Sequence, residues 1–331
     1  MKRLNGKERF ALAAGAVVAG MLLFGSCGGS VAAEEGGGQT PVQEKVLIGG
    51  SFWNAVAVVN RSAGDSVEWR YRLPRRSECN SVDVVPGTGD VLLSYRRGAR
   101  VVKRDSTNGG GTVVWDYTDV AEGEELQTAR VLPDGGYLLA ICGTPARIVE
   151  LDSTGREVRR EVRFDLGIEP AHSQFRRVAK AANGNYLIPV ITAGKVVEID
   201  STGNRAGVYE VGGVPFSVQE LAGGNLLVAL GSGHSAVEIA RGGSSSGAVV
   251  NRIDSVAGVP LHFVAQTERL ANGNTLIANW QGYLQSGDPT TAQLVEIDPA
   301  GAVVWTFDGR GGRPVRHGAV DFVSTFCLFS E

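Results

Sequence analysis

Residues 182–203, ANGNYLIPVITAGKVVEIDSTG, contain the pattern that decides the fold. An Asn-Gly turn precedes an apolar run that starts at Tyr186, and a second apolar run from Val196 ends in Asp-Ser-Thr-Gly. Asn and Asp favour tight turns because they hydrogen-bond their own backbone, and Gly favours them because it adopts positive φ. Short apolar runs between such turns predict buried β-strands.

The same pattern recurs along the chain, as expected of a repeat architecture. A further β-rich run follows the second apolar run and carries Trp69, Trp115 or Trp305 in three of the copies. Each unit therefore reads as four short strands joined by turns, the composition of a propeller blade. The first apolar run starts at Val46, Val91, Tyr137, Tyr186, Leu226 and Thr275, and the second recurs as VVKRDST (101–107), IVELDST (148–154), VVEIDST (196–202), AVEIA (236–240) and LVEIDPAG (294–301).

The units predict the whole architecture. Six of them fill residues 44–331 at about 48 residues each, and no stretch of these residues has sustained helical periodicity. The first unit lacks an innermost strand, while residues 318–323 (GAVDFV) resemble residues 80–85 (NSVDVV), the innermost strand of the second unit. We therefore predict an all-β, six-bladed β-propeller with four-stranded blades. Its C-terminal strand completes the first blade and closes the ring, which removes an exposed sheet edge.

The N-terminal residues are predicted to be a targeting signal rather than part of the fold. Four basic residues precede an uncharged, largely apolar run over residues 10–24, which is too short to span a bilayer. The following Leu23-Phe24-Gly25-Ser26-Cys27 resembles a bacterial lipoprotein box, which implies lipidation of Cys27; cleavage by the ordinary signal peptidase is the alternative. We expect residues 1–26 to be a signal peptide and 27–43 a flexible tether. The propeller, residues 44–331, would then be lipid-anchored in the bacterial cell envelope, in the periplasm or at the outer-membrane surface.

Composition excludes several classes of function. A net charge of −3 lacks the basic excess of a nucleic-acid-binding protein. The sequence has no Cys-x-x-Cys, phosphate loop or dinucleotide fingerprint, and carboxylates near the expected mouth of the ring are too few for a Ca²⁺ site. We expect neither a metal nor a cofactor. Beyond Cys27 three cysteines remain, and a disulfide between Cys79 and Cys142, on the same face of adjacent units, is left open.

Polar residues recur at one place in the innermost strands. Four positions before the aligned apolar residue stand amides and one hydroxyl, which are expected at the mouth of a central channel. Such neutral donors and acceptors suit a polar ligand; the alternative is that they bind water or cap neighbouring backbone. The residues are Asn80, Gln127, Gln174, Ser217 and Gln266.

The loops of the same face hold the remaining candidates. His172, His262 and His317 lead into innermost strands, where an imidazole could act as a base, a nucleophile or an anion binder. Trp53 and Trp280 occupy equivalent loops of neighbouring units and could stack on a sugar. The alternatives are structural hydrogen bonding for the histidines and loop packing for the tryptophans. The other candidates on these loops are Asn54, Arg96, His234, Asn279 and Gln281.

Two family resemblances rest on these motifs. Asp298-x-x-Gly301-x-x-x-Trp305 and its looser copies resemble the repeat of PQQ-like (quinoprotein-type) propellers over about residues 44–323. That resemblance implies pyrroloquinoline quinone as a cofactor, although the carboxylates that bind it in quinoproteins are not identified here. A histidine before an innermost strand, followed by Asn-Gly-Asn, as in His172 with 183–185 and His262 with 272–274, is similar to six-bladed bacterial arylsulfotransferases. In those enzymes a channel histidine is sulfated.

Three functions therefore compete. The first is binding of a small polar or glycan-like ligand at the channel mouth without catalysis. The second is sulfate or related ester transfer by His172, His262 or His317. The third is a scaffold that presents one face to an envelope protein.

Overall fold

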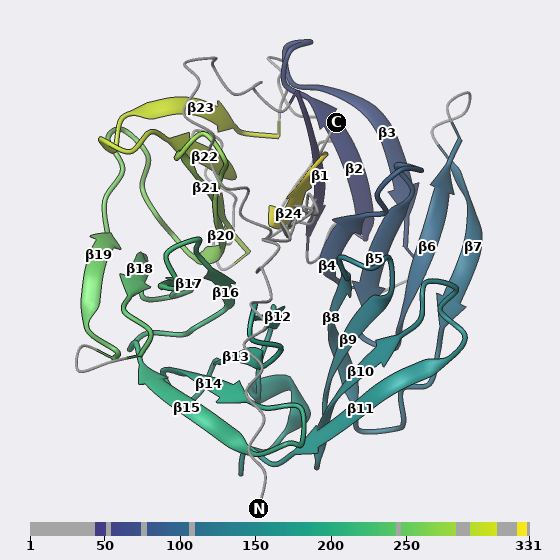
Figure 1. Cartoon of the computed structure of the whole chain (residues 1–331). Helices are drawn as coiled ribbons and strands as arrows, with labels where there is room; N and C mark the ends of the chain where they lie inside the picture. Colours follow the sequence, from purple (N-terminus) through teal and green to yellow (C-terminus); the bar gives the residue numbers. More distant parts are fainter. Residues whose placement is uncertain are drawn as a thin grey trace, which may run out of the picture.

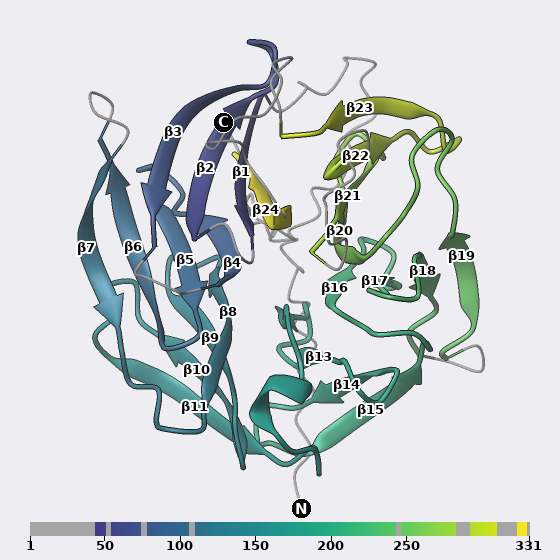
Figure 2. The same ribbon diagram turned by 180° about the vertical axis from the view of Figure 1, so that it is seen from behind.

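The structure, a computed structural model, describes residues 44–50, 54–73, 78–105, 110–242, 246–282, 292–309 and 323–329. These residues form six four-stranded antiparallel sheets arranged as blades around one axis (Figures 1 and 2). The predicted all-β, six-bladed propeller is therefore confirmed.

The blades are numbered along the chain, with the strands of each given from the axis outward. Blade 1 comprises β24 (Val323–Leu328), β1 (Lys45–Gly50), β2 (Ala55–Asn60) and β3 (Ser66–Arg72). Blade 2 comprises β4 (Cys79–Val84), β5 (Val91–Tyr95), β6 (Gly98–Arg104) and β7 (Gly111–Tyr117). Blade 3 comprises β8 (Glu125–Val131), β9 (Tyr137–Cys142), β10 (Ala146–Leu151) and β11 (Val158–Phe164).

Blade 4 follows a short 3-10 helix, η1 (Ala171–Ser173), and comprises β12 (Ala179–Lys180), β13 (Tyr186–Val190), β14 (Lys195–Ile199) and β15 (Arg205–Glu210). Blade 5 comprises β16 (Ser217–Glu220), β17 (Leu226–Ala229), β18 (Ala236–Ile239) and β19 (Val249–Ile253). Blade 6 comprises β20 (Val264–Arg269), β21 (Thr275–Asn279), β22 (Leu294–Ile297) and β23 (Val303–Phe307). In blades 2 to 6 the second strand begins at the residue that the repeat predicts.

The C-terminal strand closes the ring. β24 pairs antiparallel with β1, with Cys327 opposite Leu47. The closing strand runs from Val323 to Leu328, whereas the sequence comparison predicted residues 318–323; residues 318–322 lie outside the described residues. Packing explains the later position, because Val323 and Phe326 are fully buried in the core between blades 6 and 1.

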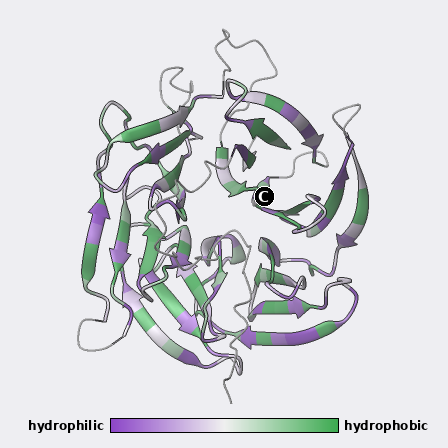
Figure 3. Ribbon diagram, turned by 45° about the horizontal axis from the view of Figure 1, so that its top comes forward, coloured by the Kyte–Doolittle hydropathy of each residue, from purple (hydrophilic) through white to green (hydrophobic). Residues whose placement is uncertain are grey.

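The core lies between neighbouring blades. In blades 2 to 6 the second strands are buried along their whole length, because blades cover both faces of each sheet. The outer strands are half-exposed: β11 buries Val162 and leaves Val158 59 % exposed. Along the outermost strands, Figure 3 shows hydrophobic and hydrophilic residues in mixed order.

The repeated turns are stabilised by hydrogen bonds within the turn itself, as predicted. In blade 4 the Oδ1 atom of Asp200 accepts hydrogen bonds from the backbone N–H groups of Thr202 at 2.8 Å and Asn204 at 3.0 Å. Gly203, with a φ of +92°, lies between them in the left-handed region. The face at which the innermost strands begin is called the upper face here, and these turns lie at the opposite, lower face.

Ion pairs near the lower face join successive blades, and we call them blade staples. The third strands of blades 3 to 6 carry a glutamate in the Val-Glu-Ile/Leu repeat, and each glutamate pairs with a basic residue of the next blade. The Arg241–Glu198 staple has two hydrogen bonds, Nη2 to Oε1 at 2.7 Å and Nε to Oε2 at 3.0 Å. The four staples are Lys180–Glu150, Arg241–Glu198, Arg269–Glu238 and Arg61–Glu296.

The Asn-Gly-Asn turns support the staples from within the blade. Asn185 Nδ2 donates to Glu198 Oε1 at 2.6 Å, and Asn274 Nδ2 donates to Glu296 Oε1 at 2.6 Å. The last asparagine of each turn therefore has a structural partner, which a turn preference alone does not reveal.

Candidate functional site

The innermost strands present a polar level near the upper face. Ser81, Thr128, Ser217 and Gln266 each lie opposite the fourth residue of the adjacent second strand. Arg177 joins this level through a parallel bridge to Ser217. Its side chains are buried, and all of them are polar.

This register differs from the sequence alignment at three of its five positions. Asn80 and Gln127 lie one residue before the level, because each is the extra residue of a β-bulge in its strand. Gln174 lies three residues before Arg177, ahead of the short strand β12. A bulge shifts the register without changing the apolar pattern, so the alignment could not detect it.

Most of the predicted polar residues bond the backbone of a neighbouring segment. Ser217 Oγ accepts from Thr267 N at 3.2 Å, and Gln266 Nε2 donates to Phe326 O at 2.9 Å, each reaching the next blade. Asn80 Nδ2 likewise donates to Leu126 O at 2.7 Å, and Gln174 bonds both the N–H and the C=O of Gly143. These contacts match the alternative that the recurring polar residues cap neighbouring backbone.

A second group of polar side chains converges on Glu125 at the start of β8. Its carboxylate is nearly buried, with 4 % of the side chain exposed. Oε1 lies 2.8 Å from Arg96 Nη2, and Oε2 lies 2.8 Å from His172 Nδ1 and accepts from Gln127 Nε2 at 3.0 Å. Three successive blades thus contribute to one cluster, which we call the Glu125 cluster: Arg96, Glu125, Gln127 and His172.

The contacts of His172 fix its tautomer. Arg176 Nη2 lies 3.0 Å from His172 Nε2, and a guanidinium can only donate. Nε2 therefore accepts, and Nδ1 carries the hydrogen that it donates to Glu125. Burial raises the pKa of Glu125, but the hydrogen bond from His172 and the charges of Arg96 and Arg176 outweigh it and lower the pKa overall.

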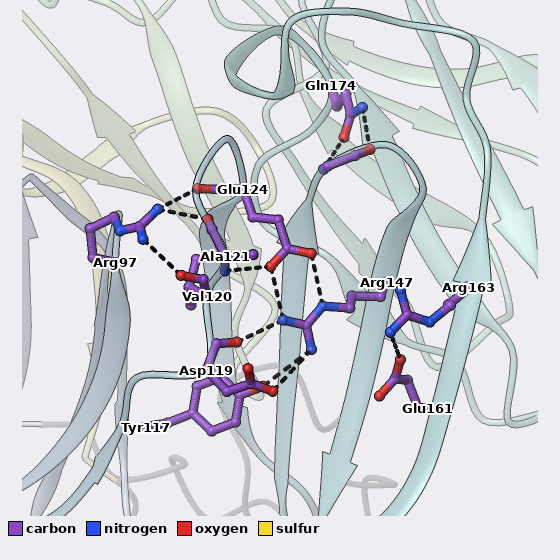
Figure 4. Close-up of polar contacts among 11 residues, drawn as sticks. Arg97, Tyr117, Asp119, Val120, Ala121, Glu124, Arg147, Glu161, Arg163 and Gln174 are labelled. Atoms are coloured by element: carbon purple, nitrogen blue, oxygen red, sulfur yellow. Dashed lines mark hydrogen bonds and ion pairs between the residues drawn. The ribbon is translucent and has the colours of Figure 1, made fainter.

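A buried ion pair positions the loop that leads to Glu125. Arg147, the second residue of β10, donates to both carboxylate oxygens of Glu124, at 3.1 and 2.9 Å, and to Asp119 O at 2.6 Å (Figure 4). On the other side of the same loop, Arg97 donates to the carbonyls of Ala121 and Val120. Because the loop is held from two blades, the orientation of Glu125 is set before any ligand arrives.

The candidates on blade 6 mostly contact their own loop and its neighbours. Asn279 is fully buried; its Nδ2 donates to Pro260 O and Ala292 O, and its Oδ1 accepts from His262 N. Trp280 packs edge-on against Phe263 with ring centroids 5.3 Å apart, and Gln281 Nε2 donates to Ala292 O at 3.4 Å. His262 leads into β20 beside them, with a buried Nε2 that makes no hydrogen bond.

The other candidates are separate from the Glu125 cluster. Asn54 accepts from Leu73 N through its backbone carbonyl, and His234 is exposed with a φ of +52°. Cys79 and Cys142 are free, buried thiols, so the disulfide left open above is not formed. Burial raises the pKa of each thiol to about 12. Cys27, Trp53 and His317 lie outside the described residues.

Sequence reasoning did not select Glu125 and Arg176, although both contact His172. Glu125 was recognisable only as one of two carboxylates in an upper-face loop, and Arg176 lies next to a strand of two residues. Within the described ranges, no three His, Cys, Asp or Glu residues are grouped to hold a metal ion. The same part of the chain contains no helix long and apolar enough to cross a membrane.

Comparisons with known proteins give a family and a fold. The family described as Mal s 1 allergenic protein-like matches residues 46–302. A crystal structure of a protein of unknown function from Bacteroides caccae is 37 % identical, with a TM-score of 0.77, and covers 88 % of this chain and 100 % of that one. No curated protein matches the chain.

More distant structures share the fold alone. A luciferin-regenerating enzyme is 11 % identical with a TM-score of 0.56, covering 79 % of this chain and 85 % of that one. A chain of a nidogen–laminin complex is 13 % identical with the same TM-score, covering 86 % and 98 %. One of these similar folds is an enzyme and the other comes from a protein complex, so the fold does not choose between the functions considered above.

Proposed function

The chain belongs to the Mal s 1-like family, and we propose that it is a binding protein that takes a small polar, glycan-like ligand on its upper face at the Glu125 cluster. The observation that carries the proposal is the contrast in exposure within the cluster. Glu125 is buried, yet it holds two polar side chains that face solvent, Arg96 at 67 % exposed and His172 at 57 %. A buried anchor that orients exposed polar side chains is a pre-organised site for a polar ligand.

The binding proposal predicts which substitutions weaken affinity. In calorimetric titrations of the purified protein with neutral sugars and sugar acids, one class of sugar should bind. Arg96→Ala and His172→Ala should each weaken that binding about tenfold, because each removes a hydrogen bond of a charged cluster. Arg159→Ala is the matched control, since it removes an exposed arginine paired with Asp134 at the lower face and should leave affinity unchanged.

If no sugar binds, or if affinity is the same in both upper-face variants, the ligand site is wrong. That result would favour the scaffold function, and the next experiment would be to identify envelope proteins that co-purify with the chain.

One geometric feature favours a second candidate, ester or sulfate transfer by His172. A carboxylate that orients an imidazole through Nδ1 is the arrangement that activates a histidine whose Nε2 reacts. Here Nε2 contacts Arg176, which could also hold an anionic ester. Among the three candidate histidines, only His172 has a described carboxylate partner.

This candidate predicts turnover of p-nitrophenyl sulfate in the presence of a phenol acceptor, followed as released nitrophenol. His172→Ala should abolish turnover, Glu125→Gln should lower it at least tenfold, and His262→Ala should leave it unchanged. An unchanged rate in His172→Ala, or no turnover by the intact protein, would rule the candidate out.

A further inference from the structure

A buried arginine lies beside the proposed site. Arg177 belongs to the polar level of blade 4 and is 2 % exposed. Its backbone N–H donates to Phe216 O at 3.1 Å, and its Nη1 donates to Ala265 O of blade 6, also at 3.1 Å. Its Nε–H is buried and has no hydrogen-bond partner.

Arg177 has no carboxylate partner among the described residues. Its guanidinium lies 5.5 Å from the centroid of the Phe216 ring, and two further cations, Arg130 and Arg176, act on it, opposed only by the buried Cys79 thiol. Burial, followed by these two like charges, lowers the pKa of Arg177 to about 9. Burying a guanidinium without a counter-charge is unfavourable in free energy, so we expect a further partner for it.

Other nearly buried arginines of this chain have such a partner. Arg147 is paired with Glu124, Arg241 with Glu198 and Glu220, and Arg61 with Glu296. Elsewhere in the ring, therefore, a glutamate accompanies a buried arginine. At Arg177 the missing partner is of the same chemical kind, a carboxylate.

A buried acceptor without a partner lies on the neighbouring strand. Gln127 is 1 % exposed, and its Oε1 makes no hydrogen bond, although its Nε2 donates to Glu125. The next residue, Thr128, bonds the backbone on both sides of Arg177, namely Arg176 O and Val178 N, each at 3.0 Å. An unpaired donor of blade 4 and an unpaired acceptor of blade 3 thus lie on neighbouring blades beside the Glu125 cluster.

We infer that the ligand of the upper face is a small hydroxylated carboxylic acid of the sugar-acid class, whose carboxylate pairs with the Arg177 guanidinium and whose hydroxyl groups face Gln127 and Glu125. This inference rests on the proposed binding function and narrows its ligand. A neutral sugar leaves the buried cation unpaired, and a dianion is repelled by the Glu125 carboxylate. A single carboxylate with hydroxyl donors satisfies all three groups.

The test compares sodium glucuronate, glucose and sodium chloride at equal ionic strength. Thermal unfolding is followed for the intact protein, for Arg177→Met and for the surface control Arg159→Met. Glucuronate should raise the melting temperature of the intact protein and of Arg159→Met relative to sodium chloride. Its apparent affinity for Arg177→Met should fall at least tenfold, while the response to glucose should be the same in all three.

Arg177→Lys is the second variant, in case the methionine variant does not fold. It keeps the charge but loses the planar fork, so we expect glucuronate affinity to fall about tenfold. Equal stabilisation by glucuronate in the intact protein and in the Arg177 variants would overturn the inference and leave ligand binding standing. Stabilisation by glucose but not by glucuronate would overturn the choice of ligand class alone. No shift with either sugar would overturn both proposals.

Discussion

Arg241→Ala should lower the free energy of unfolding by about 3–5 kcal/mol, the cost of breaking a buried ion pair from one side. The substitution leaves the Glu198 carboxylate, 6 % exposed, without its guanidinium. Burial alone would raise the pKa of Glu198, but the hydrogen bonds from Arg241, Asn185, Asn183 and Tyr209 lower it to about 2. The variant also removes a contact between blades 4 and 5 and so weakens the ring itself.

Urea unfolding at pH 7, followed by tryptophan fluorescence, measures this loss as a lower midpoint. Arg159→Ala is the matched control: its partner Asp134 is exposed, so we expect a change below about 1 kcal/mol. Because the folded pKa of Glu198 lies below the unfolded value of 4.5, its contribution is complete above pH 4.5 and is lost as the pH falls towards 2. Equal losses in the two variants would show that the staple is worth no more than a surface pair.

The fold was predictable because its signal is local and repeated. In blades 2 to 6, the first residue of the second strand directly follows a recognisable turn. The starts of these strands at Val91, Tyr137 and Tyr186 could therefore be predicted from the sequence. The exact position of β24 was not predicted. This strand is separated in the chain from the rest of its blade, so its position depends on its packing against β1 and blade 6. The glutamates of the Val-Glu-Ile repeat were visible in the sequence, but their partners come from the next blade and so depend on tertiary packing.

The candidate site was predicted only in part, for the same physical reason. His172 was selected because it leads into a strand, and it does lie in a polar cluster. Its partner Glu125 is 47 residues away in the chain, so the pairing appears only when blades 3 and 4 are side by side. Asn279 shows a different effect: an asparagine in an upper-face loop suggests a ligand, and in the structure its amide nitrogen bonds the carbonyls of Pro260 and Ala292. Arg177 was missed because a single arginine just before a two-residue strand forms no distinctive sequence pattern.

A pair of carboxylates deeper in the ring should act on stability in the opposite direction to the staples. Asp83, Arg130 and Glu268 each lie opposite the second residue of the adjacent second strand, so they share one level around the axis. Burial, reinforced by the charge of Asp83 and opposed by Arg130, raises the pKa of Glu268 to about 7. Burial likewise raises the pKa of Asp83 to about 6, against the charge of Arg130 and two backbone hydrogen bonds.

Glu268→Gln should therefore stabilise the protein at pH 8. A carboxyl whose folded pKa is raised contributes stability that is present below its unfolded pKa of 4.5 and is lost as the pH rises through 7. At pH 8 the intact protein carries an ionised, half-buried Glu268, so the amide removes a cost of at most about 3 kcal/mol. At pH 4.5 both side chains are neutral when folded, so the two proteins should unfold at nearly the same urea concentration.

Urea midpoints at pH 4.5, 6 and 8 test the sign as well as the size of this effect. Glu122→Gln, which changes an exposed glutamate in the same way, should show no widening gap from the intact protein. The Glu268→Gln gap should grow with pH and level off above pH 7. A gap that is constant with pH, or one that shrinks as the pH rises, would mean that Glu268 is ionised throughout and paired with Arg130.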